Sequence, residues 1–209
     1  MNDTMKNILE WIYCIVIAFV LALLFRYFIL TPTVVKQRSM YPTLKENQRL
    51  ILSRTFRITG LQLERGDIVT FEAPSEGYSS LEVEQSNPIA KYNNEPTSAF
   101  SKFVYYTLEL TKKSYIKRVI ALEGEHVKIE NGKVYINGEE LEEEYLQDDV
   151  VTTADVFNDF IVPEGYVFCM GDNRPNSKDC RDLGCIPLEK IEGIVTFRFW
   201  PFSSWGKID

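Results

Sequence analysis

The sequence predicts a mainly β protein: one N-terminal transmembrane helix followed by a β-rich domain with a small inserted segment. One apolar run is long enough to cross a membrane, and the rest of the chain divides into short alternating segments separated by turn residues. Asn131-Gly132 and Asn137-Gly138 each supply the strongest short signal for a tight hairpin. Together these observations indicate an anchored domain built from an antiparallel meander.

The apolar run covers residues 8–30 and carries no charge between residues 11 and 25. At about 1.5 Å per residue, a helix of this length crosses a hydrocarbon core of roughly 30 Å. A cleavable signal peptide is the alternative, but the leading MNDTMK is not clearly positive and no small-x-small cleavage site precedes Pro32. We therefore expect an uncleaved anchor, with residues 1–7 as a short cytoplasmic tail and residues 31–209 as one domain.

The charges beside the run predict an orientation. Lys6 stands alone before it, whereas Arg26, Lys36 and Arg38 lie at its end or after it. Basic residues favour the cytoplasmic side, so this count places the domain in the cytoplasm.

Beyond the run, the chain predicts strands joined by turns. Short segments of strand-like composition occur at residues 49–53, 67–71, 115–122, 126–130, 133–136, 166–170 and 194–200. The variable insertion, residues 75–112, begins with a polar, loop-like stretch, 75–94. A helix is predicted after the Thr97-Ser98 cap, because apolar residues recur at helical spacing as far as Leu108. Its aromatic residues are expected in the core rather than in a cofactor site.

Composition excludes some classes of function. The 209 residues are 45% hydrophobic and 25% charged, which is typical of a globular protein. A net charge of −7 argues against nucleic acid as a partner, because phosphate binding needs a basic face. The acidic stretch at residues 139–144, with Asp148 and Asp149, is expected to be a solvated face.

The four cysteines indicate no metal site. Cys14 lies in the apolar run, and Cys169, Cys180 and Cys185 follow near the end of the chain without a C-x-x-C pair. A single histidine cannot complete a zinc cluster, so neither a metal nor a cofactor is expected. Cys180 and Cys185 can pair or stay free; their spacing does not decide.

Ser39, in the stretch KQRSMYPTL, is a candidate nucleophile or a turn residue. The usual base for a serine is a histidine, and this chain has only His126. Alternation along EHVKIE puts His126 on the solvent side, while Val127 and Ile129 face inward. A nucleophilic Ser39 therefore needs another group to take its proton.

Lys117 is the candidate base. In the predicted strand SYIKRVIAL it shares one face with Tyr115, Val119 and Ala121. Burial in that row would lower the pKa of the lysine from about 10.4 towards neutrality, where an amine acts as a general base. The alternative is a lysine whose stem packs and whose head reaches water. The strand alone leaves both open.

Four blocks in order then resemble a known family. They are MYPTL after Ser39, RGDIVTF at residues 65–71, YIKRVIALEGE at 115–125 and VPEGYVFCMGDNRPNSKDCRDLG at 162–184. After an N-terminal membrane segment, this series resembles the type I signal peptidases, and the single anchor resembles their Gram-positive branch. The likeness is weakest in residues 75–112.

The resemblance implies a β-rich catalytic domain on the outer face of the cell membrane, against the charge count. It implies a membrane-bound serine endopeptidase that cleaves signal peptides from exported preproteins after small side chains, with membrane lipid as its other partner. A dedicated peptidase of the same fold, serving few substrates such as pilins, and a non-catalytic peptide-binding homologue are the alternatives.

The resemblance also implies roles for residues. Ser39 is the nucleophile and Lys117 the base of a Ser/Lys dyad, and Ser177 holds the lysine amine by a hydrogen bond. Asp179 and Arg181 form an ion pair that supports the loop. The residues near the pockets for small side chains are Val35, Met40 and Ile116.

Three positions depart from the family pattern. Gln37 stands where serine or glycine is usual, ALEGE at residues 121–125 replaces GLPGD, and Cys180 replaces a common serine. Of the three, only Gln37 bears on the reaction itself. Its side-chain amide either donates a hydrogen bond to the oxyanion or points to solvent. Near the C-terminus, the aromatic tail FRFWPFSSW at residues 197–205 is either an interfacial contact or a buried strand end.

Overall fold

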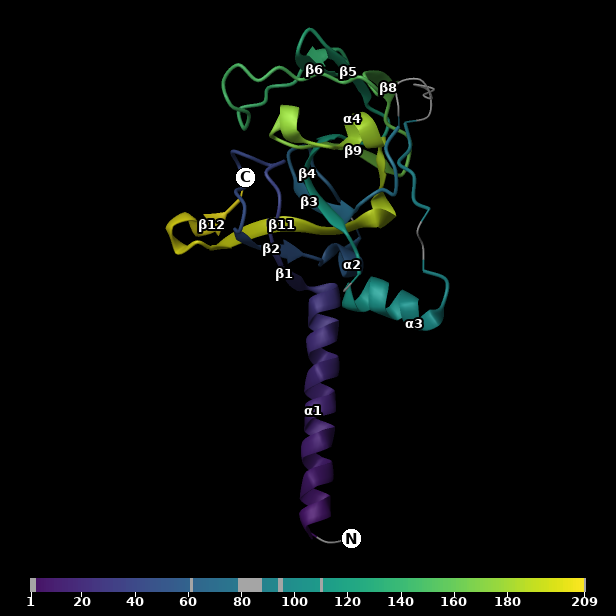
Figure 1. Ribbon diagram of the computed structural model, residues 1–209, viewed down its shortest axis with the longest axis vertical. Helices are drawn as coiled ribbons and strands as arrows, with labels where there is room; N and C mark the ends of the chain where they lie inside the picture. The colour runs from purple at the N-terminus through teal and green to yellow at the C-terminus, as the bar shows by residue number, and fades with distance from the viewer. Residues whose placement is uncertain (1–2, 61, 79–87, 94–95, 110, 209) are drawn as a thin grey trace.

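The computed structural model describes residues 3–60, 62–78, 88–93, 96–109 and 111–208. The first element, α1 (Asp3–Phe28), projects from the β domain as a long single helix (Figure 1). Its stretch Thr4–Phe28 is long and apolar enough to cross a membrane. The helix starts earlier than the predicted residue 8 and ends at residue 28, because Leu30 already pairs with Ser53 in the sheet.

The larger sheet has eight strands and contains most of the predicted ones. They are β1 (Leu30–Val34), β2 (Arg49–Ser53), β3 (Ile68–Glu72), β4 (Ser114–Ala121), β9 (Tyr166–Met170), β10 (Ile186–Pro187), β11 (Ile191–Trp200) and β12 (Gly206–Lys207). The order is β1-β2-β11-β3-β4-β9-β10, with β12 paired to β11, and all pairs are antiparallel. The fold is therefore mainly β with an N-terminal apolar helix, as predicted.

A smaller sheet lies at the end of the domain away from α1 (Figure 1). It consists of β5 (His126–Glu130), β6 (Lys133–Ile136), β7 (Glu139–Glu140) and β8 (Asp159–Ile161), in the order β7-β6-β5-β8. Both residues of each Asn-Gly pair have positive φ: 51° and 83° at the first, 54° and 88° at the second. Two such residues define the hairpin turn that matches strand twist, so both predicted hairpins are confirmed.

The short helices are α2 (Phe56–Thr59), α3 (Ala99–Lys102), α4 (Cys180–Leu183), the π-helix η1 (Phe103–Leu108) and the 3₁₀ turns η2 (Arg174–Asn176), η3 (Leu188–Lys190) and η4 (Phe202–Ser204). The predicted helix after Thr97-Ser98 is confirmed, and Ser98 caps it. The expectation that its aromatic residues lie in the core is wrong: Phe100 is 77% and Phe103 45% exposed. The segment contacts the sheet through Tyr105, whose hydroxyl donates a hydrogen bond to Glu72 Oε1. Phe100 and Phe103 are exposed instead.

Two apolar clusters form the core. The larger joins both sheets, through residues such as Phe71, Val127 and Phe168. The smaller packs Val35, Met40 and other aliphatic side chains beneath the segment that follows β1. Burying each such side chain contributes roughly 1.5–3 kcal/mol. The second cluster therefore fixes the backbone on both sides of Ser39.

The cysteines carry free thiols. Cys169, Cys180 and Cys185 are buried, and neither they nor Cys14 form a disulfide. Burial raises the pKa of the Cys169 and Cys185 thiols, since a thiolate is costly in the core. The Cys180 sulfur accepts a hydrogen bond from the Cys169 N–H at 3.2 Å. Cys169, Cys180 and Cys185 are therefore core residues, whereas Cys14 is exposed.

The aromatic tail is not a buried strand end. Trp200, Phe202 and Trp205 are 44%, 68% and 59% exposed, and the rings of Phe202 and Trp205 stack with centroids 5.9 Å apart. An interfacial contact remains a prediction.

Candidate active site

Ser39 and Lys117 meet at the centre of the site. The Lys117 amine donates a hydrogen bond to Ser39 Oγ at 2.6 Å. Ser39 follows β1 and Lys117 lies in β4, and their relative exposures are 8% and 2%. The alternative of a lysine head that reaches water is therefore wrong. The structure joins a buried hydroxyl directly to a buried amine.

Burial makes Lys117 a better base. It lowers the pKa of the Lys117 amine below its ordinary value, because the charged form loses its hydration. The carboxylates of Asp179 and Asp172 act in the opposite direction, but burial is the largest effect. More of the lysine is therefore neutral and able to accept a proton.

Ser177 approaches this centre without the predicted hydrogen bond. Its Oγ is buried and has no hydrogen-bond partner among the described residues, so the bond to Lys117 expected from the family is not formed in this structure. A Cβ placed on Gly171 would overlap both Ser177 Oγ and the Ser39 carbonyl oxygen. Glycine at this position therefore lets Ser177 pack against the nucleophile segment.

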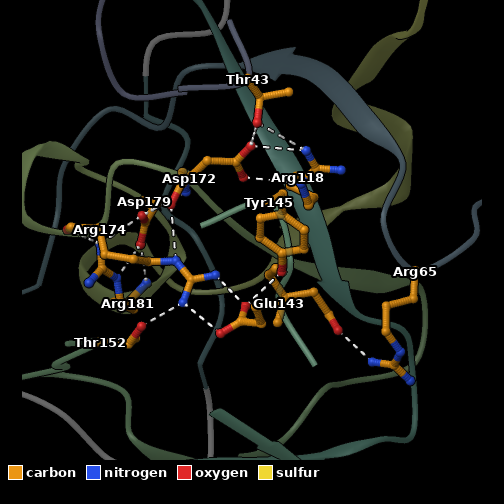
Figure 2. A network of polar contacts seen from close by, with 12 residues as sticks. Thr43, Arg65, Arg118, Glu143, Tyr145, Thr152, Asp172, Arg174, Asp179 and Arg181 are labelled. Carbon is orange, nitrogen blue, oxygen red and sulfur yellow. Dashed lines mark hydrogen bonds and ion pairs between the residues drawn. The ribbon is translucent and has the colours of Figure 1, made fainter. Parts of the chain in front are cut away.

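The predicted ion pair of Asp179 and Arg181 holds the loop that carries Ser177. Arg181 Nε lies 2.8 Å from Asp179 Oδ1, and its Nη2 lies 2.9 Å from Oδ2 (Figure 2). Asp179 also accepts the Gly171 N–H at 3.0 Å, and Arg181 Nη2 donates to the carbonyl of Ser177 at 3.2 Å. The pair thus connects both ends of the loop.

A second buried pair was missed by sequence reasoning. Arg118 donates to both carboxylate oxygens of Asp172, at 3.1 and 2.9 Å, and Thr43 Oγ1 donates to the same carboxylate at 2.6 Å (Figure 2). The next residue, Asn173, donates its N–H to the Ser39 carbonyl at 3.0 Å. This loop therefore fastens the Ser39 segment to β4. The alternation in SYIKRVIAL marks Arg118 as a charge on the face opposite Lys117.

A third buried pair corrects the view of the acidic stretch as a solvated face. The Glu143 side chain is 10% exposed and forms an ion pair with Arg174, whose side chain is fully buried. Arg174 also donates to Thr152 Oγ1 at 2.6 Å, and Tyr145 donates to Glu143 at 2.6 Å (Figure 2). A buried guanidinium needs a carboxylate. Glu143 is therefore structural, whereas Glu139 and Glu140 are exposed as expected.

A groove of about 390 Å³ opens onto Ser39. Val35, Met40 and Ile116, the predicted pocket residues, line it together with exposed Gln37. Charged residues also line it, among them Arg26, Arg54, Glu109, Lys112 and Glu192. The groove is lined by residues of β1 and β4. These two strands are not neighbours in the sheet, because β2, β11 and β3 lie between them.

His126 lies outside this site. It is in β5 of the smaller sheet, and its Nε2 lies 2.7 Å from Asp159 Oδ1 with 43% of the side chain exposed. Val127 and Ile129 beside it are buried, as the alternation predicts. Within the described ranges, no group of three or more histidine, cysteine or acidic side chains is placed to hold a metal ion. The arrangement is suited to nucleophilic chemistry by a serine with a lysine base.

Comparison with known proteins identifies the family. Residues 8–200 match the family described as signal peptidase, peptidase S26. Signal peptidase I S of Bacillus subtilis is 36% identical over 97% of this chain and 94% of its own length, and signal peptidase IB of Staphylococcus aureus is 33% identical over 96% and 93%. A solved signal peptidase I from Enterococcus faecalis matches at 27% identity and a TM-score of 0.42, covering 65% of this chain and 98% of that one. The chain therefore belongs to the signal peptidase family, peptidase S26, and is a serine endopeptidase.

Proposed function

We propose that this protein removes N-terminal signal peptides from exported preproteins, cleaving after small side chains with Ser39 as nucleophile and Lys117 as base. The observation that carries the proposal is the 2.6 Å contact between Lys117 Nζ and Ser39 Oγ inside a buried site. The relatives named signal peptidase I support the substrate class. A buried amine beside a hydroxyl matches the requirement for an activated nucleophile.

The reaction has two halves. Neutral Lys117 takes the Ser39 proton as Oγ attacks the scissile carbonyl, and the ammonium then protonates the leaving amine. Lys117, neutral again, deprotonates the water that hydrolyses the acyl-enzyme. We assign the oxyanion to the Ser39 N–H and the Gln37 amide, which lies in the groove. The buried Ser177 hydroxyl accepts a hydrogen bond from the ammonium formed in each half.

The groove accounts for an extended substrate with small side chains. β1 is the outer strand of the larger sheet, and residues 114–117 of β4 pair on one side, with β3. Each strand therefore offers backbone groups to a bound peptide. Met40 and Val35 are almost fully buried beside Ser39, which leaves room for a small side chain only.

Helix α1 serves as the membrane anchor in this proposal. It holds enzyme and preprotein in one bilayer and so raises their effective concentration. The domain lies on the extracytoplasmic face, against the charge count, because preprotein cleavage sites emerge there. Protease added to intact spheroplasts should digest the domain; protection until lysis would place it in the cytoplasm.

The activity is tested with full-length protein in detergent and a purified preprotein. We expect a new N-terminus, found by sequencing, immediately after a small residue. Ser39→Ala and Lys117→Ala should each abolish it, and the double variant should be little worse than either, because the two residues act as a unit. His126→Ala serves as the control and should retain activity. Cleavage that survives Lys117→Ala but is lost in His126→Ala would refute the dyad.

A further inference from the structure

Tyr145 contacts two buried ion pairs at once, and neither contact takes part in the proposed chemistry. It lies in the segment 141–158, which joins β7 to β8 of the smaller sheet. The guanidinium of Arg118 lies over its ring, with Cζ 4.1 Å from the ring centroid, and its hydroxyl donates to Glu143 Oε1 at 2.6 Å. Figure 2 shows the ring between these two side chains. Tyr145 therefore links Arg118 of β4 to Glu143.

Both ion pairs hold the loop that follows β9. Arg118 pairs with Asp172, which is the second residue of that loop. Glu143 pairs with Arg174, two residues further along. The side chains of Asp172 and Arg174 are fully buried, so each depends on its partner rather than on water to compensate its charge. Asn173 therefore lies between two residues that the ion pairs fix in place.

Asn173 in turn holds the peptide group that carries the N–H of the nucleophile. Its own N–H donates to the Ser39 carbonyl at 3.0 Å, and its Nδ2 donates to the Arg38 carbonyl at 3.1 Å. The Arg38 carbonyl and the Ser39 N–H belong to one planar peptide group, so a fixed carbonyl also fixes the direction of the N–H. That N–H is the backbone donor proposed for the oxyanion. Tyr145 thus reaches the oxyanion site through Asn173, without contact to the substrate.

We propose that Tyr145 is a positioning residue for the Ser39 N–H. Its ring fixes Arg118 and its hydroxyl fixes Glu143, so the two ion pairs keep one separation and Asn173 keeps both of its hydrogen bonds. Without Tyr145 both pairs remain but are free to shift. A displacement of about 1 Å at a group that stabilises the transition state can cost on the order of 10²-fold in rate. This inference rests on the proposed function and adds to it a residue remote from the substrate.

The test compares Tyr145→Leu and Tyr145→Phe with the wild type, as full-length protein in detergent. Cleavage of a preprotein gives KM, and a single-turnover experiment with saturating enzyme gives the rate constant of cleavage. A signal-peptide aldehyde gives a Ki that reports on the oxyanion site. Ser39 Oγ adds to its carbonyl carbon, and the carbonyl oxygen takes the oxyanion position as in the transition state. Leucine removes ring and hydroxyl, whereas phenylalanine keeps the ring over Arg118 and removes only the bond to Glu143.

For Tyr145→Leu we expect the rate constant to fall and the aldehyde Ki to rise, each by at least about tenfold, with KM little changed. Tyr145→Phe should change both values in the same direction by about threefold or more, because one hydrogen bond to the Glu143 carboxylate is lost. The control Tyr135→Leu removes a half-buried tyrosine from β6 of the same smaller sheet. It should leave the rate constant and the Ki at their wild-type values.

Neither the single-turnover rate constant nor the Ki depends on how much of a variant is folded. A purely structural role for Tyr145 therefore lowers the yield of active enzyme and leaves both values unchanged. That result for Tyr145→Leu would overturn the positioning role while leaving the proposed function intact. If the leucine variant does not fold, wild-type values in Tyr145→Phe overturn it. If the wild-type protein neither cuts the preprotein nor binds the aldehyde, the proposed function fails and the positioning role with it.

Discussion

Two lysines with buried side chains, Lys112 and Lys117, differ in the groups that face their amines. Lys112 stands between carboxylates, 2.8 Å from Glu192 and 3.4 Å from Glu72. Lys117 meets a hydroxyl, Ser39 Oγ, at 2.6 Å. Burial lowers the pKa of the Lys117 amine, because the charged form loses its hydration beside a neutral hydroxyl. The two amines therefore have different surroundings: Lys112 compensates buried carboxylates, whereas Lys117 contacts the candidate nucleophile.

The largest expected effect separates these two roles. Lys117→Met should lower kcat by about 10³-fold or more, because the base is lost. Lys112→Met should retain kcat within about tenfold, because its amine contacts carboxylates and not Ser39. It should lower the free energy of unfolding by about 3–5 kcal/mol, since two buried carboxylates lose their nearest cation.

Enzyme assays and denaturant titrations on both variants provide the measurement. If Lys112→Met proved as inactive as Lys117→Met while folding normally, the division of roles would be wrong.

A smaller loss of kcat is expected from substitutions at Gln37, which lies near Ser39 in the chain. Gln37 is exposed and lines the groove at the nucleophile. Gln37→Ala should lower kcat at least about tenfold, with KM little changed, because losing an oxyanion donor typically costs about 10²–10³ in rate. Gln37→Glu should be worse and Gln37→Ser should keep much of the activity. Steady-state kinetics on the three variants test this, and wild-type kcat in the alanine variant would remove Gln37 from the mechanism.

The smallest expected effect is the pH dependence of stability and activity that follows from the buried Lys117 amine. Burial lowers the pKa of Lys117 in the folded state below its value in the unfolded chain. As pH falls between these two values, the unfolded chain binds a proton that the folded protein does not, so the folded protein loses stability. Wild-type stability should therefore rise with pH across this window. The kcat/KM should rise with pH through the lowered pKa, because the neutral amine is the base.

Lys117→Met removes the titrating group and supplies the control for stability. Its free energy of unfolding should exceed that of the wild type below the window, and the difference should shrink as pH rises towards the ordinary lysine pKa of about 10.4. Urea titrations at several pH values measure both. A constant difference across the window would show that the pKa of Lys117 is not lowered.

Local sequence patterns predicted the long apolar helix, the strands and the two hairpins. Apolar length predicts α1, alternation predicts β4 and β5, and the Asn-Gly pairs predict the two hairpins, because each signal depends on a few neighbouring residues. The quoted blocks, by resemblance, pointed to Ser39 and Lys117. Alternation alone could not decide whether the lysine head reached water.

The tertiary structure decided the contacts. Lys117 meets Ser39 across 78 residues of sequence, and Arg54 meets Glu109 across 55. Such pairs form only when distant strands and segments pack together, and no local pattern specifies them. For the same reason, Glu143 belongs to a buried network although it lies in an acidic stretch, and Phe100 is exposed although its spacing suggested the core. Burial and charge compensation are properties of the assembled sheet, whereas periodicity is a property of the chain.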